Sequence, residues 1–140
     1  MSTSDKGFTV RRAGHLVIRC TDPVRTAQFF KDVVGFTQKG VVQRGMHFLT
    51  SDFNENHHML LVRPALDGAV AQDADSLVGM ARISYEITDP IAYNKVVARL
   101  IDANASPELG SAKGRRFVRF KDPDGLPYEF YCRADNEQAA

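Results

Sequence analysis

His15-Leu-Val-Ile-Arg-Cys-Thr-Asp-Pro23 recurs as Arg82-Ile-Ser-Tyr-Glu-Ile-Thr-Asp-Pro90, 67 positions further along the chain and without a gap. Both stretches alternate apolar and polar residues, as a strand with one buried face does. Both end in Thr-Asp-Pro, which favours a helix start, because aspartate caps the first amides and proline is tolerated at the first helical position. The internal repeat therefore predicts two copies of one strand–helix unit.

The residues around each copy extend this unit in the same order. Apolar residues at helical spacing predict helices over 23–34, where Gly35 ends the helix, and over 90–102. Alternating runs predict further strands at 36–42, 46–51, 58–63, 107–109, 116–121 and 128–132, the last two joined by the turn Asp122-Pro-Asp-Gly125. The prediction is an α+β fold of two tandem βαβββ modules, residues 13–63 and 80–133, joined by a linker over 64–79. The two sheet faces curl toward each other and enclose a cleft.

Length and composition limit the classes of function. With 140 residues, 44% of them hydrophobic, the chain suits a single domain over residues 1–140. A net charge of +1 gives no electrostatic reason to expect nucleic acid or a membrane surface as a partner. Cys20 and Cys132 show no spacing typical of a zinc site or a redox pair, and we expect them to be free. No apolar run is long enough to span a membrane, so we expect a soluble, cytoplasmic protein.

Several segments together resemble the vicinal oxygen chelate superfamily, which contains glyoxalase I, fosfomycin and bleomycin resistance proteins and extradiol ring-cleaving dioxygenases. They are Gly14-His-Leu-Val-Ile-Arg, Thr21-Asp-Pro, Phe29-Phe-Lys-Asp-Val-Val-Gly-Phe36, His57-His58-Met-Leu-Leu-Val and Lys121-Asp-Pro-Asp-Gly-Leu-Pro-Tyr-Glu-Phe130. They extend over about residues 13–133. The histidine pair before an alternating strand is most similar to the dioxygenase branch. The resemblance also implies a homodimer, since family members generally pair their modules.

The resemblance implies a metal position between the modules, with ligands from the first and last strands of each. Transferred by position, the four residues are His15, Val62, Arg82 and Glu129. Dioxygenases of this family hold Fe(II) or Mn(II) with two histidines and one carboxylate, and their fourth position is apolar. His15 and Glu129 match that set, but Arg82 stands where the second histidine belongs. Arginine stays protonated and cannot donate a lone pair to a metal, so we expect metal binding to be weak or absent.

Further residues complete the predicted site. His58 is expected near the cleft wall as an acid–base residue, on the same strand face as Val62, and Arg82 is expected to pair with Glu129 and to contact the ligand. Phe48 and Tyr85 are expected to line the ligand pocket. His57 is expected to point the other way, and His47 is expected on the surface.

Two alternatives for function remain open. The first is a protein of the glyoxalase, bleomycin resistance and dioxygenase kind that binds a small aromatic or oxygenated organic molecule in the cleft, as a dioxygenase with a degenerate metal site. The second is a metal-free binding or sequestering protein, or a lyase or isomerase, of the same fold. The sequence does not decide whether the chain is an enzyme.

Overall fold

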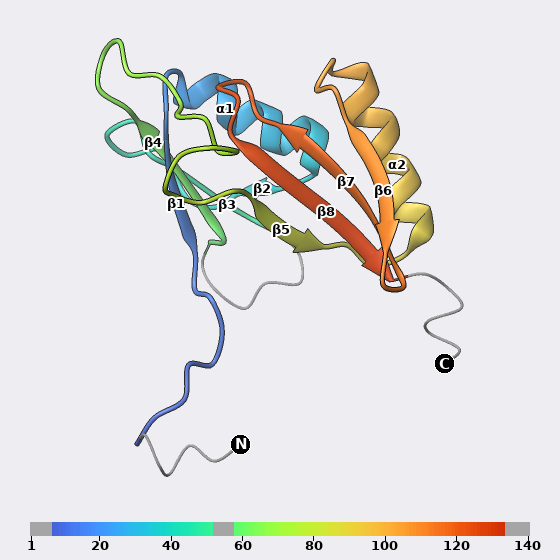
Figure 1. Ribbon diagram of the computed structural model, residues 1–140. Coiled ribbons are helices and arrows are strands. Elements are labelled where there is room, and N and C mark those ends of the chain that lie inside the picture. Colours follow the sequence, from blue (N-terminus) through green and yellow to red (C-terminus); the bar gives the residue numbers. More distant parts are fainter. Residues whose placement is uncertain (1–6, 52–57, 134–140) are drawn as a thin grey trace.

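The computed structural model describes residues 7–51 and 58–133, and its two halves have matching plans (Figure 1). The first comprises β1 (Leu16–Cys20), α1 (Pro23–Phe29), a π-helical turn η1 (Phe30–Val34), β2 (Thr37–Gln38), β3 (His47–Thr50) and β4 (Leu60–Pro64). The second comprises β5 (Ile83–Glu86), α2 (Pro90–Asp102), β6 (Glu108–Ala112), β7 (Arg115–Lys121) and β8 (Pro127–Arg133). The strand orders are β1-β4-β3-β2 and β5-β8-β7-β6. The α+β class with tandem βαβββ modules is confirmed, with the modules as two separate four-stranded sheets.

Each helix begins where Asp-Pro predicts. The carboxylate of Asp22 accepts a hydrogen bond from the Arg25 amide at 3.2 Å, and that of Asp89 accepts one from the Ala92 amide at 2.8 Å. The predicted helix over 23–34 is α1 followed by the wider η1 turn, and it ends at Gly35 in the left-handed conformation, with φ of 86°. Neither helix is long and apolar enough to cross a membrane, within the described ranges.

One hydrophobic core joins the two modules. α1 packs on β1, β3 and β4 of its own module, and the aromatic side chains that follow it reach the second module. The Phe30 ring lies 5.2 Å from that of Tyr128, and the Phe36 ring lies 5.8 Å from that of Tyr85. A polar contact adds to this, because the Asp124 carboxylate accepts hydrogen bonds from the Thr21 amide at 3.0 Å and hydroxyl at 2.6 Å. The segment that follows α1 thus packs against the second module.

The structure corrects the strand boundaries of three segments. The strand predicted over 36–42 is only β2, because Gly40 has φ of 69° and Val41 and Val42 beyond it are exposed. The strand predicted over 58–63 begins two residues later, at Leu60, and the one predicted over 107–109 extends to Ala112.

One prediction about a single residue is also wrong. His47 is buried rather than on the surface, because it pairs with Val62 on the face that α1 covers. Burial and the nearby Lys31 charge lower the pKa of His47. Cys20 and Cys132 are buried thiols with no disulfide between them, as expected.

Register contradicts one assignment transferred from the repeat. Val17 and Ser84 are repeat counterparts, and they pair with Leu61 and Glu129 respectively. Leu61 is therefore the counterpart of Glu129, and Val62 is not. One extra residue separates β5 from β8, compared with β1 and β4. A one-residue shift moves a side chain to the opposite face of a sheet, so Val62 lies in the core while Leu61 shares the open face with Val17.

Candidate functional site

The open face of the second sheet carries a row of polar side chains. Register aligns Ser84 of β5 with Glu129 of β8, Glu129 with Arg119 of β7, and Arg119 with Glu108 of β6. Residues directly opposite each other on neighbouring strands share a face, so all four lie on the face that the helices leave uncovered. This row places a carboxylate between a hydroxyl and a guanidinium group.

Glu129 is the centre of this row, and both of its carboxylate oxygens have partners. The Ser84 hydroxyl donates to Oε1 at 2.7 Å, and Arg119 Nε donates to Oε2 at 3.1 Å. Arg82 Nε approaches the same Oε2 at 3.8 Å, so the expected ion pair is present. Burial raises the pKa of Glu129, but the Ser84 hydrogen bond and the two arginines outweigh it and hold the pKa below its ordinary value. Glu129 is therefore ionised and charge-compensated at neutral pH.

Two histidines form a second cluster, in the first module. The imidazole rings of His15 and His58 lie with their centroids 4.6 Å apart, and the Phe48 ring meets that of His58 edge-on at 5.1 Å. His58 lies two residues before the first residue of β4, so strand alternation does not determine the sheet face on which its side chain lies. Its ring contacts that of Phe48 on the open face. His57 lies outside the described residues. This arrangement brings two predicted site residues, His15 and His58, next to the predicted aromatic residue Phe48.

A cavity of about 610 Å³ connects the two modules. We call it the inter-module cavity; its lining includes His15, Met59, Met80, Ser84 and Glu86. His15 and Ser84 therefore face one space, and Ser84 is hydrogen-bonded to Glu129 behind it. Arg82 and Glu129 do not line this cavity. Of the predicted site residues, His15 and His58 thus form one cluster and Arg82 and Glu129 form another, and Ser84 links the two.

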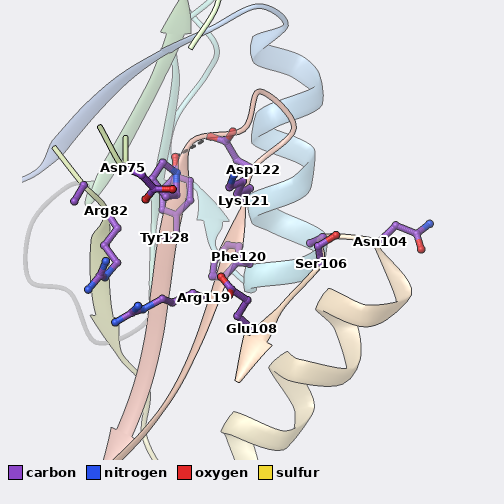
Figure 2. Close-up of a pocket in the computed structure, with 13 residues that line it drawn as sticks. Asp75, Arg82, Asn104, Ser106, Glu108, Arg119, Phe120, Lys121, Asp122 and Tyr128 are labelled. Atoms are coloured by element: carbon purple, nitrogen blue, oxygen red, sulfur yellow. Dashed lines mark hydrogen bonds between the residues drawn. The ribbon is translucent and has the colours of Figure 1, made fainter. Parts of the chain in front are cut away.

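Arg82 lines a different cavity, of about 560 Å³, on the second module (Figure 2). We call it the arginine cavity, because Arg82 and Arg119 lie on its wall together with Lys121 and Glu108. The guanidinium groups of Arg82 and Arg119 lie next to each other in Figure 2, and both approach Oε2 of Glu129.

Tyr85 borders the inter-module cavity, but most of its ring belongs to the core. Its partner across the sheet is Phe130, which places it on the face opposite Ser84, and its ring meets that of Phe36. Burial raises the pKa of Tyr85 to about 12, so its hydroxyl stays protonated at neutral pH.

Sequence reasoning missed Arg119 and Ser84 as partners of Glu129. A signal for Arg119 was present, because residues 119 and 129 are both five positions from Asp124 in the predicted turn and pair in its hairpin. Ser84 has no comparable signal, since its pairing with Glu129 depends on the register of two parallel strands far apart in the sequence.

These residues do not fit a site with two histidines and one carboxylate. Arg82 supplies no metal-binding atom where the second histidine belongs, and both oxygens of Glu129 are already hydrogen-bonded. Within residues 7–51 and 58–133, no group of three histidine, cysteine, aspartate or glutamate side chains is arranged to hold an ion. The geometry instead pairs an ionised carboxylate with two arginines, beside a cavity that contains an imidazole.

Comparison with known proteins supports the fold and the family. The model of the Glyoxalase/Bleomycin resistance protein/Dioxygenase superfamily matches residues 12–130. A glyoxalase/dioxygenase from Nostoc punctiforme has a similar structure, with a TM-score of 0.75, 16% identity, and coverage of 89% of this chain and 92% of that one. A fosfomycin resistance protein from Mesorhizobium loti matches with a TM-score of 0.65, 12% identity, and coverage of 94% and 100%. No curated protein sequence matches.

Proposed function

Because the chain belongs to the Glyoxalase/Bleomycin resistance protein/Dioxygenase superfamily, we propose that it binds a small oxygenated organic molecule in the inter-module cavity without a tightly held divalent metal. One observation supports the absence of a tightly held metal. Glu129, the only carboxylate at the positions that hold the metal in dioxygenase relatives, has its two oxygens engaged by Ser84, Arg119 and Arg82. A metal ion would have to displace these partners and lie beside two fixed positive charges.

The lining of the cavity supports a ligand that is partly apolar and carries oxygen atoms. Met59 and Met80 offer polarisable thioether groups that pack well against rings, while His15 and Ser84 offer hydrogen-bonding groups. Cavities of this size, with apolar walls and a few polar groups, suit small organic ligands. An aromatic molecule with hydroxyl or carbonyl substituents matches both kinds of wall.

A second candidate is a metal-dependent enzyme of the dioxygenase kind, and the imidazole pair favours it. His15 and His58 lie 4.6 Å apart and next to Phe48, which would bring an acid–base residue close to an aromatic ligand. In this candidate His58 moves the proton.

Catechol, a neutral oxygenated aromatic, is a suitable probe for the cavity. The chain has four methionines, of which Met59 and Met80 line the cavity and Met46 does not. With ¹³C-labelled methionine methyl groups, we expect catechol to shift the resonances of Met59 and Met80 in a saturable way and to leave that of Met46 in place. Met80→Arg should abolish the shift at Met59. Val78→Arg is the matched control, since Val78 is fully exposed and outside the lining of this cavity. Shifts that are equal at all three methionines, or that persist in Met80→Arg, would contradict binding at this place.

A further inference from the structure

Two arginines serve one carboxylate on the second sheet, and this leaves a positive charge without a balancing partner. Arg119 and Arg82 both approach Oε2 of Glu129, at 3.1 and 3.8 Å. Compensation of Glu129 alone would need a single arginine, so the cluster has an excess of one positive charge. The side chains of Arg82 and Arg119 are 39% and 40% exposed, whereas that of Glu129 is 14% exposed. The excess charge therefore faces the arginine cavity rather than the protein interior.

The geometry of the two guanidinium groups leaves their donors available. Both reach Glu129 through Nε, and among the described residues no hydrogen bond engages their terminal amino groups. Arg119 also lies over the Phe117 ring, 4.6 Å from its centroid, which restricts the plane of its guanidinium. Gly110 lies opposite Phe117, and a Cβ there would come within 2.4 Å of the ring, so the close packing of Phe117 depends on glycine. Arg119 is thus held in place by a specific local arrangement.

The other charged residues of the cavity do not cancel this excess at the two guanidinium groups. The Asp122 carboxylate accepts hydrogen bonds from the Tyr128 hydroxyl at 2.9 Å and from the amides of Asp124 and Leu126. Glu108 is opposite Arg119 in register but makes no ion pair with it in the described structure, and Figure 2 shows its carboxylate apart from the two guanidinium groups. Lys121 and Asp75 add one charge of each sign to the wall, so together they leave the excess unchanged.

We propose that the arginine cavity binds the carboxylate of a small organic acid on the terminal amino groups of Arg82 and Arg119. Planar guanidinium groups bind carboxylates with paired, directional hydrogen bonds. A monoanion balances the excess of one charge, whereas a dianion such as phosphate would leave a net negative charge beside Glu129. The cavity volume of about 560 Å³ leaves room for an organic group behind the carboxylate. The site is separate from the inter-module cavity, because the two cavities share no lining residue.

Sodium benzoate is the probe, and the side-chain Nε–Hε resonances of the arginines are the readout. We expect benzoate to shift the Arg82 and Arg119 resonances in a saturable way, when sodium chloride keeps the ionic strength constant. Arg82→Gln should weaken benzoate binding at least tenfold. This variant retains the shorter Arg119–Glu129 pair, so it should stay folded, which circular dichroism checks. Arg133→Gln is the matched control, because Arg133 forms a comparable exposed pair with Glu86 at 3.6 Å and lines neither cavity. Its benzoate affinity should stay within twofold of the wild type.

Three results would overturn the proposal. One is the absence of saturable shifts at Arg82 and Arg119. Another is an equal loss of affinity in Arg82→Gln and Arg133→Gln, which would indicate general charge attraction. The third is inorganic phosphate binding as tightly as benzoate or more tightly, which would contradict a site for a monocarboxylate. Catechol shifts at Met59 and Met80 do not depend on Arg82, so failure here is distinguishable from failure of the proposed function.

Discussion

Replacing Arg119 by glutamine removes the shorter of the two ion pairs that Glu129 makes, and its cost follows from distance and exposure. The nitrogen and oxygen atoms are 3.1 Å apart, and the Arg119 and Glu129 side chains are 40% and 14% exposed. Two unit charges about 4 Å apart attract each other by about 4 kcal/mol at an effective dielectric constant of ~20, and by about 1 kcal/mol in water. Because Arg119 is partly solvated, and part of the attraction is offset by desolvation and lost side-chain freedom, we expect a coupling of about 1.5 kcal/mol.

Urea unfolding of a double-mutant cycle measures this coupling. The cycle uses Arg119→Gln, Glu129→Gln and the double variant, at pH 7 and moderate salt. The matched cycle uses Arg133 and Glu86, whose side chains are 56% and 51% exposed at 3.6 Å, and we expect a coupling of about 0.5 kcal/mol or less there. Equal couplings in the two cycles would refute the conclusion that Glu129 is a partly buried carboxylate that depends on Arg119.

The pH dependence of folding stability tests the same stabilisation of the ionised Glu129 carboxylate. The pKa of Glu129 in the folded protein lies below the ordinary value of 4.5. A carboxyl whose pKa is lowered on folding stabilises the protein above its unfolded-state pKa, and this contribution is lost as the pH falls through its folded-state pKa. The stability difference between wild type and Glu129→Gln should therefore be constant near neutral pH and shrink under acidic conditions. A difference that grows as the pH falls would contradict the assignment.

Three further changes test the surrounding structure by urea unfolding. Gly110→Ala should destabilise by about 1–3 kcal/mol, because its Cβ would lie 2.4 Å from the Phe117 ring, and Phe117→Leu should relieve part of this cost. Asp124→Ala should cost about 1–3 kcal/mol by removing the acceptor for the Thr21 amide and hydroxyl, whereas an unchanged midpoint would show that this contact between the modules is not stabilising. Arg82→Gln should cost less than about 1 kcal/mol, because its pair is long and 39% exposed on the arginine side, and a loss near 3 kcal/mol would show a truly buried pair.

Much of the fold was predictable because its determinants are local. The repeated alternation and the Asp-Pro caps act within a few residues, and both helices begin where they predict. The burial of His47 was not predictable from alternation, because alternation gives two faces but not which of them a helix covers. The strand predicted over 36–42 was too long, because Gly40 has a positive φ and the strand pairing ends before it.

The site was predictable in part, for a related reason. The Arg82–Glu129 pair follows from the repeat and the family resemblance. The contacts of Arg119 and Ser84 with Glu129 depend on strand register. The counterpart of Glu129 is Leu61 rather than Val62 for the same reason, because the spacing between β5 and β8 is one residue longer than that between β1 and β4. A shift of one residue leaves the sequence pattern almost unchanged but reverses the face. The homodimer stays a prediction.

Titration of Mn(II) into the protein under anaerobic, reducing conditions, followed by electron paramagnetic resonance of the free ion, tests the central claim most directly. We predict that wild type takes up no stoichiometric Mn(II), because Arg82 and Arg119 already compensate Glu129. Arg82→His should bind Mn(II) more tightly than wild type, since the change removes a positive charge and supplies an imidazole beside Glu129. Tight binding of one equivalent by wild type, lost in Glu129→Gln, would contradict the account and favour the metal-dependent enzyme.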